Sequence, residues 1–519
     1  MLTRLVIAYL ISFALVAQNA PHLGDWKPPA SESRQRPITN CAALRSMTGY
    51  EFTVATAVEE PSRDGIPSFC RILGQVQPDI RLEVALPAAW NGRLYMFGNG
   101  GYAGENIEAA ARLTRRNEAL SLGFAVAQTN TGHDAEQEPL GTFAVNSQKL
   151  YDYAFRAVHV TAMTAKKLAA AYYGSSPSRS YFVGCSTGGR QALISAQRFP
   201  EDFDGIVAGA PVLNFSGTMV YNVAVAQALA RAPIPPEKLK TLADRIYFLC
   251  DAIDGVKDGL IEDPRRCGFR ASRDLPRCPA GTDSPDCFTA DQIRTLEVIY
   301  GEVSAGGKRI SPGWPVGAEI AEPNGRSAWE RWIIPRDNEP TRSAVFAETF
   351  FRYLAYPQKD PNWQLEQFDF ERDVPRTEWI AKVLNATDTD LSAFRDRGGR
   401  LLMWFGWADP ALNPLFGVEY FESVVQRMGS ETRNFFRLFM LPGVFHCAGG
   451  PGCASFDPLA PLIEWVEHGK APDRLTASRR DAAGKVVRSR PLCPYPQVAK
   501  YKGAGSIDDA ASFTCAEPE

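Results

Sequence analysis

Residues 181–190, YFVGCSTGGR, decide the fold of this 519-residue chain. The short apolar run 181–183 leads into the turn 184–188 (GCSTG), and residues 191–199 behind it have the composition of a helix. A G-x-S-x-G sequence between a strand and a helix is typical of a nucleophile elbow, whose tight turn needs small residues beside the serine. We therefore interpret Ser186 as a nucleophile. The alternative is a glycine-rich turn that buries a serine.

Strand-like runs lie on both sides of this turn. They are residues 81–86 (RLEVAL), 93–97 (RLYMF) and 124–128 (FAVAQ) before it, and 206–210 (IVAGA), 400–405 (RLLMWF) and 435–441 (FFRLFML) after it. Residues 151–173 repeat apolar side chains near helical spacing. Strands that alternate with helices predict an α/β fold with a mostly parallel sheet.

Strand-like runs are rare over the whole segment from residue 214 to residue 388. This segment is rich in Pro, Gly, Cys, Trp and charged residues, and it holds few clean strands. We interpret it as an inserted lid domain, so that residues 21–213 form the first part of the core and residues 389–519 form the second part.

The N-terminus predicts export. Arg4 precedes the apolar stretch 5–16 and the small residues 17–20, which together describe a secretory signal peptide over residues 1–20. The alternative is a membrane anchor, but the apolar run is short for a bilayer span. We expect a secreted or periplasmic protein with no stable membrane association after signal removal. The net charge of -3 and the lack of long like-charge runs argue against a nucleic-acid partner.

A nucleophilic serine needs a base, and the chain has five histidines. His446 follows the run 435–441 in a Pro-Gly loop late in the chain, which is where a fold with this elbow places its base. His133 also lies in a loop and could line a pocket. We therefore predict that His446 is the base.

The acid that orients the base should follow a strand between the serine and the histidine. Asp409 comes directly after the run 400–405, in the sequence 406–410 (GWADP). The alternative for Asp409 is a turn-capping role before proline. Asp396 and Asp388 precede the strand and therefore rank below Asp409.

Two backbone N–H groups must hold the oxyanion in acyl transfer. One comes from the residue after the nucleophile, Thr187. The other is expected from the glycine-rich segment 98–104 (GNGGYAG), where the backbone can approach a substrate closely, and we assign it to Gly101. The alternative, a phosphate-binding loop, lacks the GK[ST] that should follow it.

Eleven cysteines favour an oxidising compartment. Spacing suggests four neighbour pairs, although sequence alone does not fix connectivity: Cys41–Cys70, Cys250–Cys267, Cys278–Cys287 and Cys493–Cys515. Cys185, Cys447 and Cys453 remain. Cys185 immediately precedes Ser186, and Cys447 immediately follows His446. If the two partners meet, these cysteines lie close together and could bridge.

The chain resembles the tannase and feruloyl esterase family in three places: 184–190 (GCSTGGR), 406–410 (GWADP) and 446–447 (HC). The resemblance runs over nearly all of the chain beyond the signal peptide. It implies an α/β-hydrolase core with a large lid inserted after the nucleophile region, and a disulfide between Cys185 and Cys447. The four neighbour pairs fit the family pattern, which leaves Cys453 as the odd thiol.

Residues 251–260 (DAIDGVKDGL) set three carboxylates in a tight glycine-rich loop. Hard oxygen ligands suit Ca²⁺, but the spacing is not that of an EF-hand, and a solvated Asp-Gly turn is an equal alternative. The family resemblance implies a structural Ca²⁺ in the lid. Its ligands would be the carboxylates of Asp251, Asp254 and Asp258 and the carbonyls of Val256 and Leu260.

The predicted chemistry is hydrolysis of a carboxylic ester through an acyl-enzyme, with no organic cofactor. The resemblance implies a small-molecule aromatic ester as substrate, with a hydroxycinnamoyl (feruloyl), galloyl or MHET-type terephthalate acyl group. The last is weakened because Leu412 stands where the half-ester hydrolase has an aromatic clamp. A secreted serine peptidase and a non-catalytic binding protein are the alternatives from other classes.

A bulky acyl group needs apolar walls. The lid offers Trp314, Trp329, Trp332, Phe350, Phe351 and Tyr353. Any one of these is more easily explained as part of the lid core than as a wall of the pocket.

Overall fold

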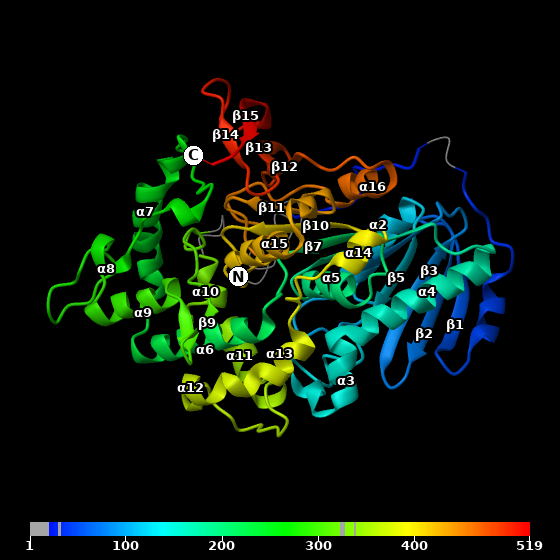
Figure 1. The fold of residues 1–519 in the computed structure, drawn as a ribbon, viewed down its shortest axis with the longest axis horizontal. Helices are drawn as coiled ribbons and strands as arrows, with labels where there is room; N and C mark the ends of the chain where they lie inside the picture. The colour runs from blue at the N-terminus through cyan, green and yellow to red at the C-terminus, as the bar shows by residue number, and fades with distance from the viewer. Residues whose placement is uncertain (1–19, 30–32, 322–326, 337–338, 519) are drawn as a thin grey trace, which may run out of the picture.

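The computed structural model describes residues 20–29, 33–321, 327–336 and 339–518. The signal peptide lies outside these residues except for Ala20, so it stays a prediction. Among the described helices, none is long and apolar enough to cross a membrane. Figure 1 shows a core built around one sheet, with the helices of the lid to one side of it.

One nine-stranded sheet organises the core, in the order β1-β2-β3-β5-β4-β6-β7-β10-β11. The strands from β5 to β11 in this order run parallel, whereas β1, β2 and β3 form an antiparallel edge. Their bounds are β1 (Thr53–Glu60), β2 (Phe69–Val76), β3 (Ile80–Pro87), β4 (Arg93–Phe97), β5 (Ala125–Thr129), β6 (Arg179–Cys185), β7 (Gly205–Gly209), β10 (Arg400–Gly406) and β11 (Phe436–Leu441). The prediction of a mostly parallel α/β sheet is confirmed.

Both faces of the sheet are buried. Along β4, Leu94 and Met96 pack into one hydrophobic cluster, and Tyr95 and Phe97 pack into another. A strand between two apolar layers requires this two-residue alternation. The cluster that holds Tyr95 continues to Trp329 of the lid, so lid and core share one hydrophobic interior.

The helices of the core connect these strands. They are α2 (Ala110–Ser121), α3 (Ser147–Tyr151), α4 (Ala157–Tyr173), α5 (Thr187–Arg198), α14 (Ser392–Asp396), α15 (Pro414–Met428) and α16 (Leu459–His468). The helix expected over 151–173 consists of α3 and α4 joined by one π-helical turn, Asp152–Arg156. α5 begins directly after Ser186 rather than at residue 191, so its N-terminus lies at the serine.

The lid between β7 and β10 is mainly helical. Its elements are α6 (Phe215–Arg231), α7 (Leu239–Cys250), α8 (Ala271–Asp274), α9 (Ala290–Tyr300), α10 (Trp329–Trp332), α11 (Arg342–Tyr353), α12 (Phe370–Asp373) and α13 (Glu378–Leu384), with the short strands β8 (Val303–Ala305) and β9 (Lys308–Ser311). α6 packs against α9 and α11, and Figure 1 shows them together beside the core.

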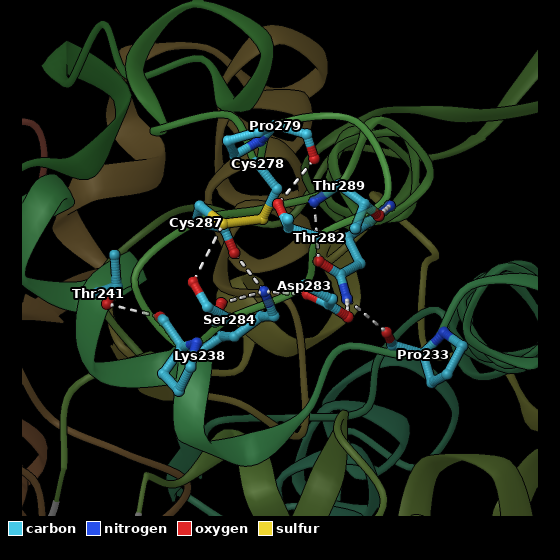
Figure 2. Close-up of a disulfide and its surroundings, with 12 residues drawn as sticks. Pro233, Lys238, Thr241, Cys278, Pro279, Thr282, Asp283, Ser284, Cys287 and Thr289 are labelled. Carbon is cyan, nitrogen blue, oxygen red and sulfur yellow. Dashed lines mark hydrogen bonds and ion pairs between the residues drawn. A yellow bond between two sulfur atoms is a disulfide. The ribbon is translucent and has the colours of Figure 1, made fainter.

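One loop of the lid is closed by the disulfide Cys278–Cys287, shown in Figure 2. Lys238, a buried residue, reaches into this loop. Its Nζ donates to the Ser284 carbonyl at 2.6 Å and also to the Cys287 carbonyl. The same nitrogen pairs with Asp283 Oδ1 at 2.6 Å. The loop is therefore held by a covalent bond and by a buried cation whose donors are satisfied.

The C-terminal residues do not extend the central sheet. Instead β12 (Leu475–Arg480) pairs with β13 (Val486–Leu492), and β14 (Val498–Tyr501) pairs with β15 (Phe513–Ala516). The expectation that all of 389–519 belongs to the α/β core was therefore too simple. Pro494 and Tyr495 touch the outer edge of β11, where the N–H of Tyr495 donates to the Leu438 carbonyl at 2.7 Å. This segment covers the sheet edge, and its prolines stop a longer pairing.

Candidate active site

The predicted catalytic residues gather at one edge of the sheet. Ser186 follows β6, Asp409 follows β10 and His446 follows β11, while the segment 98–104 follows β4. These strands run parallel, so their carboxyl ends meet at the same edge. Open α/β sheets place their ligand sites there.

Ser186 occupies a strained turn between β6 and α5. Its φ of 63° and ψ of -122° are unusual for a residue with a side chain. The turn fits only because glycines surround it. A Cβ built on Gly98 would lie 2.5 Å from the Cα of Gly188, and one built on Gly184 would lie 2.8 Å from the same atom. The backbone of the loop that follows β4 therefore packs directly on the elbow.

The serine, histidine and aspartate form one continuous line. His446 Nε2 lies 2.9 Å from Ser186 Oγ, and His446 Nδ1 lies 2.8 Å from Asp409 Oδ2. These are hydrogen-bond distances in the arrangement that activates a serine nucleophile. The structure thus brings together the three residues that the sequence predicted as the triad.

The Asp409 carboxylate is fully buried and held on its far side. Its Oδ1 accepts the N–H groups of Ala411 at 2.8 Å and Leu412 at 3.0 Å. The carbonyl of the same residue accepts Trp314 Nε1 at 2.9 Å. Asp396, ranked below Asp409, instead pairs with Arg395 at the surface. The N–H groups fix the carboxylate toward His446 and offset the cost of burying its charge.

All five predicted disulfides are present, and Cys453 is the free, buried thiol. The bond between Cys185 and Cys447 joins residues 262 positions apart, with their Cα atoms 6.0 Å from each other. It links the elbow to the loop that carries His446. Cys447 has a φ of 63°, so both the nucleophile turn and the base loop are strained next to this bond.

The two predicted oxyanion donors lie in adjoining segments. Thr187 Oγ1 donates to the Gly101 carbonyl, which also accepts the Tyr153 hydroxyl at 3.1 Å. Within the described part of the chain, the backbone N–H groups of Thr187 and Gly101 donate to no protein acceptor. Both are thus available to a substrate oxygen, which is the property an oxyanion hole needs.

Tyr153 and Arg190 support this loop, and neither role was predicted from the sequence. Tyr153 lies in the π-helical turn, which aims its hydroxyl at Gly101. Arg190 is fully buried and donates to the carbonyls of Tyr153 at 3.1 Å and Ala154 at 2.8 Å. Arg190 is the last residue of the motif 184–190 (GCSTGGR), and this position was the sequence feature that could have pointed to its role. The π-turn has no sequence signature of its own, although such turns often occur at functional sites.

His133 packs behind the oxyanion loop and does not line an open pocket. Its ring stacks on Phe143 with centroids 4.0 Å apart and lies against Gly104. Neither ring nitrogen has a hydrogen-bond partner among the described residues. Burial lowers the pKa of His133 to about 4, because the charged form is poorly solvated there.

The aromatic wall of the site is smaller than the sequence suggested. Trp314, Trp329, Phe350 and Phe351 are buried in the shared interior of lid and core. Trp332 and Tyr353 are half-buried, and of the two it is Trp332 whose ring meets that of His446 edge to face at 5.8 Å.

Phe346 joins Trp332 in this wall. Phe346 stacks on Trp332 at 6.3 Å, and its ring lies beside Gly101. The guanidinium of Arg342 lies 5.4 Å over Trp332. Phe346 was missed because α11 carries several aromatic residues, and only tertiary packing decides which one faces the site.

The acidic loop of the lid has the donor set of a cation site. One oxygen of each carboxylate accepts backbone N–H groups of the loop. Asp251 accepts the N–H groups of Asp258 and Gly259, both at 3.0 Å. Asp254 accepts the N–H of Val256 at 3.0 Å, and Asp258 accepts the N–H of Leu260 at 3.1 Å. Among the described residues, the second oxygens of Asp251 and Asp254 have no protein donor. Burial, and then the neighbouring Asp258 and Asp251, raise the pKa of Asp254 to about 6. Hard oxygens and uncompensated negative charge fit Ca²⁺.

Two cations bear directly on the loop: Lys257 belongs to it and is exposed, and Arg490 pairs with one of its carboxylates. Arg490 of β13 pairs with the second oxygen of Asp258, and both side chains are buried. Three carboxylates against the Lys257 ammonium and the Arg490 guanidinium still leave one net negative charge. The carboxylates predicted as ligands share one loop, but among the described residues their oxygens do not all lie within 4.8 Å of one another.

The parallel sheet, the strained serine after β6 and the Ser–His–Asp line place this chain in the class of α/β-hydrolases. More specifically, the chain belongs to the tannase and feruloyl esterase family, whose family model matches residues 66–516. It is a carboxylic ester hydrolase.

Known proteins support this membership. The mono(2-hydroxyethyl) terephthalate hydrolase of Piscinibacter sakaiensis is 31% identical, over 88% of this chain and 86% of its own length. Feruloyl esterase B of Aspergillus niger is 30% identical, over 86% of each chain. The crystal structure of feruloyl esterase B from Aspergillus oryzae superposes with a TM-score of 0.81 at 27% identity, covering 92% of this chain and 99% of that one.

Proposed function

We propose that this enzyme hydrolyses esters of aromatic acids through an acyl-enzyme on Ser186. The observation that carries the proposal is the line of contacts from Asp409 through His446 to Ser186 Oγ. It provides a nucleophile, a base and a buried group that orients the base.

The reaction follows from this geometry. His446 Nε2 takes the proton of Ser186 Oγ as the oxygen attacks the ester carbonyl. The N–H groups of Thr187 and Gly101 stabilise the oxyanion of the tetrahedral intermediate. Collapse breaks the ester bond, and His446 gives the proton to the leaving alcohol. Water then attacks the acyl-enzyme by the same route and releases the acid.

The aromatic acyl group is supported by the wall of the site. Trp332 and Phe346 offer ring faces beside His446 and Gly101, where the acyl half of a bound ester would lie. The relatives in Piscinibacter sakaiensis and Aspergillus niger are named for terephthalate and feruloyl esters.

A terephthalate half-ester is the second candidate substrate. Arg342 beside Trp332 places a cation at the aromatic wall, where a second carboxylate of the acid could pair with it. Leu412, which has no ring, argues in the other direction. Arg342→Ala should therefore raise KM for a half-ester more than for a neutral ester.

A substrate panel with one matched pair of variants tests the proposed reaction. Methyl ferulate, methyl gallate, a terephthalate half-ester and a peptide anilide are compared on wild type, Ser186→Ala and Ser195→Ala. Ser195 is a buried serine on the same helix, donating to the Gln191 carbonyl at 3.0 Å. We expect ester turnover in wild type and Ser195→Ala only. Turnover that survives in Ser186→Ala, or hydrolysis of the anilide alone, would overturn the proposal.

The acidic loop of the lid is proposed to bind Ca²⁺. Asp251, Asp254 and Asp258 would supply carboxylates, and Val256 and Leu260 would supply carbonyls. The ion would neutralise the loop and hold its shape. Metal analysis after dialysis without chelator should find about one calcium per chain. Protein that carries no calcium and does not gain thermal stability when calcium is added would contradict this.

Export is proposed from the predicted signal peptide and the five disulfides, which favour a secreted or periplasmic protein. N-terminal sequencing of the protein recovered outside the cytoplasm should find a start near residue 21. A start at Met1 would contradict it.

A further inference from the structure

The acidic loop of the lid touches the loop that carries the catalytic base. Leu260, one of the proposed carbonyl ligands, has a buried side chain that lies against Gly443. A methyl group built on the Cα of Gly443 would come within 2.6 Å of Leu260 Cδ2. Gly443 precedes His446 by only three residues, so the contact lies close to the reacting centre.

Gly443 is also where the His446 loop closes on itself. Its carbonyl accepts the N–H of Gly452 at 2.9 Å, and the N–H of Phe445 donates to the Gly449 carbonyl at 3.3 Å. Gly443 has a φ of 64°, a conformation that glycine adopts with less strain than a residue with a side chain. Because the turn is compact, a displacement of Gly443 is passed on to His446.

The acidic loop is anchored on its other side to the C-terminal strands. Arg490 of β13 pairs with Asp258, and Val256 packs in a small cluster with Cys493, Ala499 and Phe513. These contacts hold the loop away from the site. On the side of the active site, Leu260 contacts the segment that carries the base.

We infer that Leu260 is a positioning residue for His446, acting through Gly443. The inference deepens the proposed function and rests on the proposed Ca²⁺ site, because an ion that holds the Leu260 carbonyl also fixes the side chain supporting Gly443. Binding of Ca²⁺ to the acidic loop then not only stabilises the lid but also sets how firmly His446 is held. Small displacements of a catalytic group lower turnover strongly.

Two truncations of equal size test the contact. Leu260→Ala removes the side chain against Gly443 and keeps the backbone carbonyl. Ile261→Ala, its control, removes as many atoms from the next residue, whose side chain lies near Gly317 in the shared interior of lid and core. We expect Leu260→Ala to lower kcat about tenfold with KM unchanged. The rate at which a fluorophosphonate labels Ser186 should fall in parallel, and Leu260→Met should restore both.

Ile261→Ala should keep kcat within about twofold of wild type while losing comparable thermal stability. Equal kcat losses in the two alanine variants would reduce Leu260 to an ordinary packing residue and overturn the inference. So would a Leu260→Ala enzyme whose kcat and labelling rate equal those of wild type.

Hydrogen exchange over residues 442–452 tests the link to the ion. Chelation should speed exchange there in wild type, whereas Leu260→Ala should exchange fast before chelation while still carrying its calcium. An unchanged rate in wild type, after metal analysis shows that calcium has left, would overturn the link. If the purified wild type holds no calcium, the Ca²⁺ proposal fails by itself, and the kcat comparison of the alanine variants decides the role of Leu260.

Discussion

The catalytic edge of the core and the 278–287 loop of the lid are each closed by a disulfide, but the two bonds do different work. Cys185–Cys447 joins segments 262 residues apart, whereas Cys278–Cys287 closes a loop of nine. In the chain-entropy model these links are worth about 5 to 6 and about 2.5 kcal/mol. The long link also fixes the distance between nucleophile and base, whereas the short one closes a loop that Lys238 already holds.

A buried basic side chain from each region, Lys238 and His133, shows a second difference. Lys238 has oxygen partners for its ammonium group, two carbonyls and a carboxylate. His133 behind the oxyanion loop has no hydrogen-bond partner among the described residues. The lid loop thus satisfies its buried charge, whereas the core keeps a neutral ring against the loop that must receive the substrate. The comparison teaches that stability and placement of reacting groups are separate tasks in this molecule.

The largest effect should come from removing the long disulfide. In the Cys185→Ser, Cys447→Ser double variant we expect the free energy of unfolding to fall by about 5 kcal/mol. We also expect kcat to fall at least tenfold, because the base loop can then drift from Ser186. Urea unfolding and ester turnover measure the two effects. Full activity in a destabilised variant would show that this bond is structural only, like that of the lid.

An intermediate effect is expected from His133, and its sign follows from its pKa. The folded-state pKa is lowered from 6.5 to about 4, so below pH 6.5 the unfolded chain binds a proton that the folded chain does not. This contribution to stability is present above pH 6.5 and is lost as the pH falls to about 4, by roughly 3 kcal/mol.

The free energy of unfolding is measured for wild type and His133→Asn across pH 4 to 7. The contribution of His133 is the difference between the two slopes of that free energy against pH. The variant should lose less stability on acidification than wild type. Parallel slopes would mean that His133 is as easily protonated when folded as when unfolded, and the contrast with Lys238 would fail.

The smallest effect should come from the lid disulfide. Cys278→Ser with Cys287→Ser should cost at most about 2.5 kcal/mol and leave kcat within about twofold. Adding Lys238→Met should then cost a further 1 to 3 kcal/mol or so, because the Ser284 and Cys287 carbonyls lose their donor. A large loss of kcat in the first variant would contradict the division of tasks between the two regions.

The core was predictable because local pattern and global fold agree there. Each buried strand is a short apolar run, and the parallel sheet needs the chain to return to the same edge after each helix. That rule placed Ser186, Asp409 and His446 without any structural information. Cys185 and Cys447, which flank Ser186 and His446, also led to the prediction of a disulfide between the elbow and the base loop.

The lid and the C-terminal strands were less predictable, for a physical reason. The longest helix of the lid, α6, is buried on several faces, so its sequence shows no single apolar stripe. Which aromatic residue reaches the site depends on how α11 packs, and that is why Phe346 was missed. The contact of Leu260 with Gly443 joins positions far apart in the chain, and no local pattern encodes it.

The close packing of Gly98, Gly184 and Gly188 also bears on how this enzyme can evolve. A Cβ added at Gly98 or Gly184 would lie within 2.5 Å of another backbone, whereas one at Gly188 would lie 3.2 Å from its nearest atoms, so the first two positions resist single substitutions most strongly. Trp332 and Phe346 stand on lid helices outside that packing. New acyl preferences are therefore most accessible through exchanges in the lid, while the catalytic edge is inherited unaltered.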